Sequence, residues 1–301
     1  MTIPSFADLK RDLLSLESVD KKRVVVANAT DEHTLQSVLS LYHEGLITPI
    51  LVGDEKEIIS LLETLKEEPK DFAIIHGNDD TDTAQKSVAL IKEDKADVLM
   101  KGHLQTRDLL KAVVNKENGI REQKVLSHVA INEVPSYHKL LFITDGGMML
   151  TPDLPTKEEL LKNALSVTKA LGYDETKIGV LDATENVNPK LQASLDAAEL
   201  KKLSGKGDFA GSVIEGPISL DLSISKEIAK EKEYNSPVAG EADILLVPDI
   251  ITGNVLGKSL TTLAGGKMAG LIVGAKCPIV LTSRGSSTEE KLNSLILAIS
   301  L

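Results

Sequence analysis

Residues 23–29 read RVVVANA, residues 32–44 read EHTLQSVLSLYHE, and this pair of segments decides the fold. The first is an apolar run without polar alternation, which is typical of a strand buried on both faces of a parallel sheet. The second repeats its apolar residues at helical spacing. Strand-like runs at residues 49–53, 71–76 and 96–100 are each followed by a helical segment as well. Such regular alternation predicts a doubly wound α/β domain.

The alternation changes between residues 124 and 144, where two strand-like runs follow each other without a helical segment. This pattern predicts an antiparallel pair and a domain junction. The chain of 301 residues also exceeds the roughly 250 to 300 residues that one hydrophobic core supports. We therefore predict a discontinuous first α/β domain, residues 1–128 plus 271–301, and a second α/β domain, residues 129–270.

The composition excludes several classes of function. A net charge of −11 and a pI of 5.1 disfavour nucleic acid or an anionic membrane as a partner, because both favour a basic protein surface. No apolar run approaches the ~18 to 20 residues of a membrane span, and the first 14 residues lack a secretory signal, so we expect a cytoplasmic protein. The single Cys277 and the scattered histidines predict no metal site, and we assign the histidines no catalytic role.

The segment at residues 278–291 reads PIVLTSRGSSTEEK and delivers Ser283 and Arg284 to the end of a predicted strand. In an α/β sheet, ligands bind at this end of the strands. Arginine suits a phosphate or carboxylate through its planar donors, and serine donates to a developing negative charge. Glu290 is either a general base or the last residue of a helix capping box that begins at Ser287.

A second segment, residues 236–274, contains an apolar strand that leads through Gly253 and Asn254 towards a predicted helix. A helix that begins after a glycine-bearing loop offers free amides to a phosphate, so we predict an anion site there. The alternative is that Gly253 and Gly257 only shape a turn and allow close helix packing. The stretch GNVLGKS is one residue too short for a nucleotide phosphate loop, and no GxGxxG follows the first strand, which disfavours nucleotide hydrolysis and a dinucleotide domain.

Two further clusters stand at predicted strand ends. Lys101 and Gly102 follow one strand, and Thr106 opens the next helix. Residues 144–149 place Asp145 and two glycines after another strand. Taken singly, such clusters are more often turns than binding sites.

Several blocks in this order resemble the phosphate acetyltransferase and phosphate butyryltransferase family. They are SPVAGEADILLVPDIITGNVLGKSL at 236–260, AGGKMAGLIVGAKCPIVLTSRGSS at 264–287 and VLMKG at 98–102. The resemblance extends over essentially the whole chain. The last block and VLDATENVNPK at 180–190 are more similar to the butyryl branch than to the acetyl branch.

The resemblance implies reversible acyl transfer between an acyl-coenzyme A and inorganic phosphate, which gives an acyl phosphate and coenzyme A. It implies that coenzyme A is a substrate, that there is no bound cofactor or metal, and that no covalent acyl-enzyme forms. It also implies two domains with parallel or mixed sheets and flanking helices, like those of the isocitrate and isopropylmalate dehydrogenases, with a cleft between the domains, and a homodimer.

The family's Ser-Arg pair and following carboxylate fall on Ser283, Arg284 and Glu290. By this resemblance Glu290 takes the proton of the coenzyme A thiol, Ser283 stabilises the oxyanion and Arg284 holds the phosphate. Glu290 stands where the acetyl enzymes have aspartate, and Lys111 where the family has arginine. The residues expected to contact coenzyme A are Lys101, Gly102, Thr106, Lys111, Gly253, Asn254 and Lys258.

Three alternatives remain open from the sequence. One is a phosphate acetyltransferase, and another is a non-catalytic protein that binds acyl phosphates or coenzyme A. The third is a metal- and NAD-dependent dehydrogenase of the same fold, which needs an acidic cluster for Mg²⁺. For that cluster the sequence offers only the scattered Asp145, Asp182 and Asp249.

Overall fold

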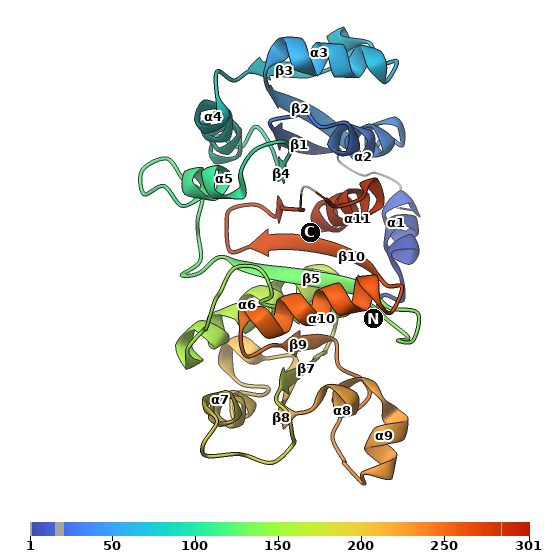
Figure 1. Ribbon diagram of the computed structural model, residues 1–301, viewed down its shortest axis with the longest axis vertical. Coiled ribbons are helices and arrows are strands. Elements are labelled where there is room, and N and C mark those ends of the chain that lie inside the picture. The colour runs from blue at the N-terminus through green and yellow to red at the C-terminus, as the bar shows by residue number, and fades with distance from the viewer. Residues whose placement is uncertain (1, 16–20, 284) are drawn as a thin grey trace. The chain divides into compact units, whose positions relative to one another are not determined.

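The computed structural model describes residues 2–15, 21–283 and 285–301 (Figure 1). The chain divides into two compact units. We call Leu9–Lys124 with Ala269–Leu301 the terminal unit, and Met1–Asp8 with Val125–Met268 the central unit. The units change at 124/125 and 268/269, whereas the sequence-based boundaries are 128/129 and 270/271.

The amino-terminal segment joins the central unit through the backbone. The amide of Leu140 donates to the carbonyl of Ile3 at 2.9 Å, and the amide of Phe6 donates to the carboxylate of Glu133 at 2.8 Å. These bonds explain why the first residues belong to the central unit, although the sequence-based division assigns them to the first domain.

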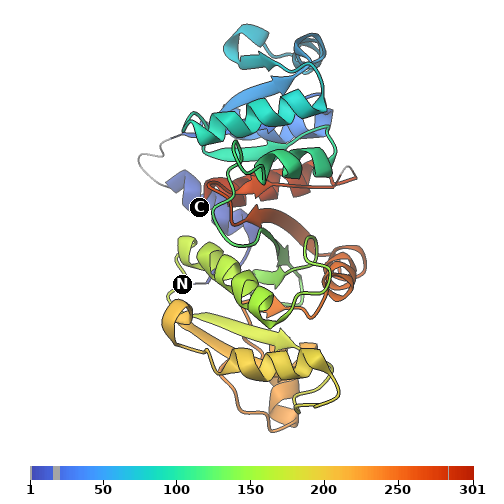
Figure 2. The same ribbon diagram turned by 90° about the vertical axis from the view of Figure 1, so that its left-hand side faces the viewer.

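The terminal unit is built on a sheet with the strand order β3-β2-β1-β4-β11-β10. All neighbouring strands are parallel except β10 and β11, which are antiparallel. Helices α2 and α11 pack together on one face of this sheet, and α4 and α5 lie on the other (Figures 1 and 2). The strands are β1 Lys22–Ala27, β2 Ile47–Gly53, β3 Ala73–His76, β4 Val98–Lys101, β10 Lys267–Val273 and β11 Ile279–Val280. The helices are α1 Phe6–Ser15, α2 Glu32–His43, α3 Glu55–Thr64, α4 Asp80–Lys92, α5 Thr106–Val113 and α11 Thr288–Ile299.

The central unit has the strand order β5-β6-β9-β7-β8. The predicted antiparallel pair is confirmed as β5 and β6, and the remaining neighbours are parallel. The strands are β5 Ser127–Glu133, β6 Leu141–Thr144, β7 Thr176–Leu181, β8 Ser212–Ile218 and β9 Ile244–Leu246. The helices are α6 Leu154–Ala170, α7 Gln192–Lys201, α8 Leu220–Ile224, α9 Lys226–Glu231 and α10 Ile250–Thr262. Within the described ranges, no helix is long and apolar enough to cross a membrane.

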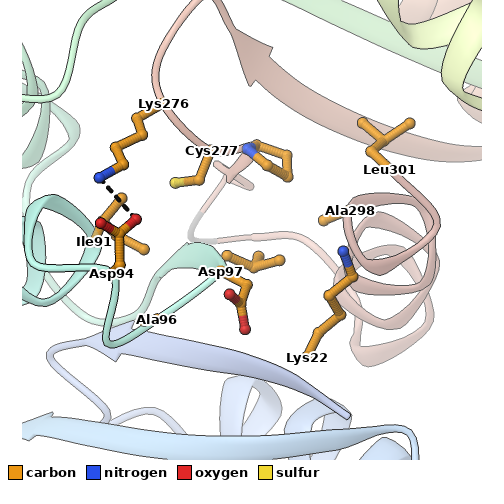
Figure 3. A pocket seen from close by; sticks show the side chains of 11 residues that line it. Lys22, Ile91, Asp94, Ala96, Asp97, Lys276, Cys277, Ala298 and Leu301 are labelled. Atoms are coloured by element: carbon orange, nitrogen blue, oxygen red, sulfur yellow. Dashed lines mark ion pairs between the residues drawn. The ribbon is translucent and has the colours of Figure 1, made fainter. Parts of the chain in front are cut away.

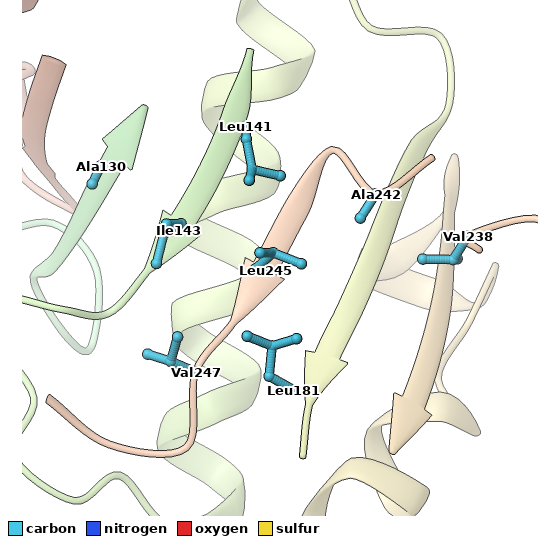
Figure 4. Close-up of a cluster of buried hydrophobic side chains, with 8 residues drawn as sticks. All are labelled: Ala130, Leu141, Ile143, Leu181, Val238, Ala242, Leu245 and Val247. Atoms are coloured by element: carbon cyan, nitrogen blue, oxygen red, sulfur yellow. The ribbon is translucent and has the colours of Figure 1, made fainter. Parts of the chain in front are cut away.

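The core of the central unit lies where strand side chains meet α8 and α10. Figure 4 shows the buried cluster, to which α10 adds Leu256 and Leu260. These two leucines are four residues apart and therefore share one face of α10. Both leucines are partly buried against the cluster, so they contribute less than the ~1.5 to 3 kcal/mol of a fully buried leucine, and they hold α10 on the sheet. The buried members are Ala130, Leu141, Ile143, Leu181, Val238, Ala242, Leu245 and Val247.

A buried ion pair joins three strands of the central unit. Asp243, 1% exposed, accepts a hydrogen bond from the ammonium of Lys139, 3% exposed, at 2.5 Å. The second carboxylate oxygen of Asp243 accepts from the amide of Lys177 at 2.7 Å. These contacts connect the starts of β6, β7 and β9, because Lys139, Lys177 and Asp243 stand at or just before those strands.

Replacing Asp243 with alanine should destabilise the protein strongly, because it removes the nearer carboxylate partner of the buried Lys139 ammonium and leaves only Glu241, whose carboxylate lies 3.6 Å away. Breaking a buried pair in this way costs about 3 to 5 kcal/mol. The midpoint of urea unfolding measures the loss. The control is Glu93→Ala, which breaks the exposed pair with Lys95 and should shift the midpoint little. Equal shifts in the two variants would contradict this account.

Candidate active site

The candidate site of the terminal unit lies at the edge where the parallel strands β1, β4 and β11 end. The backbone of Asn28, which follows β1, is in contact with the loop after β4. The amides of Gly102 and His103 donate to the carbonyls of Ala27 and Asn28 at 2.8 and 2.7 Å. A Cβ atom on Gly102 would lie 2.1 Å from the Asn28 carbonyl oxygen. The edge therefore requires glycine at position 102.

Lys101 lies beneath this loop and is only 4% exposed. Its ammonium donates to the carbonyls of Gly102 and Leu104 at 3.1 and 3.0 Å. Lys101, predicted to contact coenzyme A, thus holds the loop after β4 through these two hydrogen bonds. Thr106 is the first residue of α5, and Gln105 before it makes no capping bond through its side chain.

The segment after β11 brings a serine hydroxyl and, farther along, a carboxylate to this edge. Ser283 is exposed, and its hydroxyl accepts the amide of Gly285 at 3.4 Å. The carbonyl of Ser283 accepts the amide of Ser286 at 3.1 Å, which makes a tight turn. Arg284 lies outside the described residues. The hydroxyl of Ser283 therefore stands at the strand end that the sequence predicts for it.

Glu290 makes one of the two hydrogen bonds of the predicted capping box, the one from its backbone amide. The hydroxyl of Ser287 caps α11 by accepting the amide of Glu290 at 3.1 Å. The Glu290 carboxylate does not return the bond to Ser287 among the described contacts. Its Oε1 accepts the hydroxyl of Ser286 at 2.6 Å instead. The backbone of Glu290 serves the cap, while one oxygen of its side chain is fixed by Ser286.

An ion pair between the buried Lys291 and the partly exposed Asp31 fixes the start of α11. The ammonium of Lys291 lies 3.5 Å from the carboxylate of Asp31 and 3.4 Å from the hydroxyl of Thr282. Asp31 in turn caps α2 by accepting the amide of Thr34. Burial alone would raise the pKa of Asp31, but the hydrogen bonds from Thr34 and the charge of Lys291 lower it. The sequence analysis missed this pair because its members are distant in the chain.

Lys111 lies farther along α5 and lines a pocket of about 710 Å³ between α4 and α5. The pocket contains two other lysines, and both are already paired. Lys86 binds Asp82 at 2.8 Å, and Lys92 donates to the carbonyl of Glu117 at 2.5 Å. Lys111 makes no such bond within the residues that the structure describes.

In the central unit, the predicted start of α10 is corrected. The helix begins at Ile250, and Asp249 caps it by accepting the amide of Thr252 at 2.8 Å. The amide of Gly253 donates to the carbonyl of Asp249, and the amide of Ile250 to the carbonyl of Leu150, both at 3.1 Å. The Gly253 amide, predicted to bind a phosphate, is thus engaged in the helix, and a carboxylate occupies the cap position.

Gly253 serves close packing. A Cβ atom on this residue would lie 2.6 Å from the Cα of Gly146, in the turn after β6. The side-chain amide of Asn254 reaches the carbonyl of Gly146 at 3.5 Å. Lys258 is exposed and lies seven residues after the exposed Ile251, on the same side of the helix. Only Gly253 and Asn254 of the residues predicted on α10 contact this turn in the described structure.

Asp145 fixes the same turn. Its Oδ1 accepts the amides of Gly147 and Met148 at 2.7 Å each, and its Oδ2 accepts the amide of His128 at 2.9 Å. The carboxylate is therefore occupied by backbone donors. Asp182 and Asp249 follow the neighbouring strands β7 and β9, so the topology does bring the three aspartates to one edge. Even so, no three His, Cys, Asp or Glu side chains in the described part of the chain are grouped to hold a metal.

His128 is a polar residue of this edge that the sequence analysis passed over. Its Nδ1 is buried and has no hydrogen-bond partner among the residues that the structure describes. Burial lowers the pKa of the imidazole, and the nearby Asp145 carboxylate opposes that shift. A buried polar group without a partner costs about 1 to 3 kcal/mol, which is the kind of cost that functional sites often carry.

A second pocket lies at the opposite end of the terminal sheet (Figure 3). It measures about 250 Å³, and Lys276 pairs with Asp94 at 2.8 Å beside it. Cys277 lines the pocket just before β11, whereas Ser283 follows that strand. Burial raises the pKa of the Cys277 thiol to about 12, so it is not a ready nucleophile.

Comparison with known proteins agrees with the resemblance seen in the sequence. The family model described as phosphate acetyl/butaryl transferase matches residues 8–86 and 61–299. The phosphate butyryltransferase of Clostridium acetobutylicum is 40% identical over 296 residues, which cover 98% of this chain and 97% of that protein. The phosphate acetyltransferase of Thermotoga maritima is 37% identical over 277 residues, which cover 92% and 94% of the two chains.

Solved structures support the fold. A branched-chain phosphotransacylase from Enterococcus faecalis superposes with a TM-score of 0.84 at 36% identity, covering 93% of this chain and 98% of that chain. A 4-hydroxythreonine-4-phosphate dehydrogenase from Klebsiella pneumoniae shares the fold alone, with a TM-score of 0.57 at 12% identity, covering 94% of this chain and 100% of that chain. The predicted dehydrogenase-like α/β architecture is therefore confirmed, and the chain belongs to the phosphate acetyl- and butyryltransferase family.

Proposed function

We propose that this protein transfers an acyl group reversibly between a short-chain acyl-coenzyme A and inorganic phosphate, with butyryl-coenzyme A as the first substrate to test. The observation that carries the proposal is the segment after β11. There an exposed serine hydroxyl and a carboxylate oriented by a neighbouring hydroxyl follow one strand of the sheet. The full-length similarity to phosphate butyryltransferases supports the same reaction.

In the direction of acyl-coenzyme A synthesis, the Glu290 carboxylate takes the proton of the coenzyme A thiol. The thiolate attacks the carbonyl carbon of the acyl phosphate, and the hydroxyl of Ser283 donates to the resulting oxyanion. The carbon–oxygen bond to phosphate then breaks, and inorganic phosphate leaves. Arg284 is proposed to hold that phosphate, since a guanidinium binds its oxygens in pairs. In reverse, phosphate attacks the thioester and Glu290 returns the proton to the thiolate.

The hydrogen bond from Ser286 allows Glu290 to act as the proposed general base at the position where the acetyl enzymes have aspartate. The longer side chain has one more rotatable bond, and a general base must lie within hydrogen-bond reach of its proton. The bond of 2.6 Å from Ser286 restricts that freedom by holding Oε1. Oε2 makes no bond within the described residues and is proposed to face the thiol.

We also propose that the pocket between α4 and α5 receives the phosphate-bearing end of coenzyme A. Its volume of about 710 Å³ lies within the usual range of ligand sites, about 300 to 1,000 Å³. Lys111 offers a cation there, and Thr106 and Gly102 are proposed contacts nearer the sheet edge. Coenzyme A is then a substrate, and the proposal includes no bound cofactor.

The reaction is tested by thiol release from acetyl-, propionyl-, butyryl- and isobutyryl-coenzyme A. Release should require inorganic phosphate, be fastest with the four-carbon esters and continue in the presence of a chelator. A preference for acetyl-coenzyme A would favour a phosphate acetyltransferase. Binding without turnover would indicate a non-catalytic protein, and loss of activity with the chelator that Mg²⁺ restores would contradict the metal-free reaction.

The variant Glu290→Gln separates the general base from the helix cap. Glutamine keeps the backbone amide that Ser287 accepts, so the melting temperature should stay nearly unchanged. Turnover should fall by about a hundred- to ten-thousandfold, because glutamine cannot accept the thiol proton. Glu290→Asp should retain more activity than Glu290→Gln.

The matched control is Glu289→Gln, which removes the neighbouring exposed charge in the same turn of α11. It should leave turnover near that of the natural protein. A stable Glu290→Gln variant with normal turnover would remove Glu290 from the mechanism.

We propose further that the protein is a homodimer joined through α10. This helix is unusually apolar on its outer side, where Ile251 and Val255 are 72% and 59% exposed. Leu150 and Leu263 extend the exposed apolar surface, and Lys258 is the single charged residue of the helix. A second copy of the same surface is the natural complement of a patch with so little charge.

Replacing both Ile251 and Val255 with aspartate should therefore yield monomers in sedimentation velocity at concentrations where the natural protein is a dimer. Like charges would face each other across the interface. Val187→Asp changes an exposed apolar residue elsewhere in the central unit and should leave the dimer intact. An unchanged dimer in the double variant would exclude α10 as the interface.

A further inference from the structure

We propose that Lys291 is a positioning residue for the acyl transfer, whose ammonium sets the separation between the Ser283 hydroxyl and the Glu290 carboxylate. This inference rests on the proposed function and gives a role in it to a buried cation that the reaction itself does not use. Lys291 follows Glu290 in α11, and its side chain is only 4% exposed. All the residues involved belong to the terminal unit.

The first step concerns the contacts of the ammonium. The Nζ of Lys291 donates to Oγ1 of Thr282 at 3.4 Å and lies 3.5 Å from the carboxylate of Asp31. Thr282 immediately precedes Ser283, and Lys291 immediately follows Glu290. One side-chain hydrogen bond therefore joins the neighbours of the two proposed reacting groups.

The second step compares this hydrogen bond with the others in the same segment. The amide of Ser286 donates to the carbonyl of Ser283, the amide of Glu290 to the hydroxyl of Ser287, and the hydroxyl of Ser286 to the carboxylate of Glu290. Each of these bonds spans only three or four residues and shapes the segment locally. The bond between Lys291 and Thr282 spans nine residues and closes the segment from end to end.

A further bond ties α11 to α2 without reaching the end of the strand. The hydroxyl of Thr288 donates to the side-chain oxygen of Gln36 at 3.3 Å. This bond fixes where the helix begins, but it does not involve Thr282. The position of the helix relative to Ser283 is therefore set by Lys291.

The third step separates this role from that of Asp31. A buried ammonium needs a compensating charge, and the Asp31 carboxylate supplies it while it caps α2 through the amide of Thr34. That ion pair accounts for the presence of a cation inside the protein. The hydrogen bond to Thr282, which is itself only 4% exposed, connects the ion pair to the strand end.

The fourth step concerns the kinetic constant that the contact should affect. In the proposed reaction, Glu290 takes a proton while Ser283 donates to an oxyanion that exists only after attack. Their separation therefore matters in the transition state more than in the binding of either substrate. A misplacement of about 1 Å can lower a rate by about a hundredfold. Loss of the contact should lower kcat and leave KM nearly unchanged.

Three variants test this contact. Lys291→Met keeps the length of the side chain without its charge, and it should lower kcat by about ten- to a hundredfold with the KM of both substrates within about twofold. Thr282→Val removes only the hydroxyl and should lower kcat in the same way, whereas Thr282→Ser keeps a hydroxyl and should retain most of the activity. Combining Lys291→Met with Thr282→Val should cost no more than Lys291→Met alone, because both changes break one bond. Independent, additive losses would overturn the inference.

The matched control is Lys157→Met, which breaks another buried ion pair of the protein. Lys157 of α6 lies 2.6 Å from Asp196 of α7, and both side chains are at most 5% exposed. This variant should lower the melting temperature but leave kcat unchanged when turnover is measured well below that temperature. If Lys157→Met lowers kcat as much as Lys291→Met does, the effect is one of general stability and the inference fails.

Hydrogen–deuterium exchange tests the contact without relying on turnover. The amides of Ser286 and Glu290 are hydrogen-bonded inside the segment that Lys291 closes. Both should exchange faster in Lys291→Met and Thr282→Val than in the natural protein, and at nearly the natural rate in Thr282→Ser. This result is expected even if the protein transfers no acyl group, so failure of the reaction and failure of the contact can be told apart. Unchanged exchange, or faster exchange with unchanged kcat, would overturn the assignment.

Discussion

Close approach of backbone to backbone is the constraint on which both candidate edges depend. In the terminal unit, Gly102 lies so near the carbonyl of Asn28 that a side chain would overlap it. In the central unit, Gly253 and Gly146 meet in the same way. Each contact joins the end of one strand to the next loop or helix. These contacts fix the loops at the two edges together with the hydrogen bonds that Lys101 and Asp145 make to the same loops.

Charged groups complete each edge in different ways. In the terminal unit, the Lys291–Asp31 pair ties the start of α11 to the start of α2, and Glu290 and Ser283 lie on either side of the turn that it restrains. In the central unit, Asp145 is surrounded by amide donors and holds a turn. This use of Asp145 also argues against a metal-dependent dehydrogenase, since both carboxylate oxygens of Asp145 and one of Asp249 already accept backbone amides. The chain therefore shares the fold of the dehydrogenases without the metal-binding carboxylates that their reaction needs.

Much of this organisation could be predicted from sequence. The alternation of apolar runs and helical periods predicted the α/β class and the antiparallel pair, because those features are local. The predicted start of α10 was wrong. The sequence analysis placed it after Gly253 and Asn254, whereas the helix begins at Ile250 with Asp249, a favoured capping residue, before it. Lys291 with Asp31, and His128 with its unpaired nitrogen, could not be found in this way. Their roles arise from contacts between distant segments and from burial, which no short pattern records.

The central claim is direct transfer between coenzyme A and phosphate, without an acyl group attached to the protein. The buried Cys277, with its raised pKa, agrees with that claim. The most direct test incubates the protein with unlabelled butyryl-coenzyme A and labelled coenzyme A, first without phosphate and then with it. The account predicts that label enters butyryl-coenzyme A only after phosphate is added. Label that enters without phosphate would reveal a covalent acyl-enzyme and contradict the account.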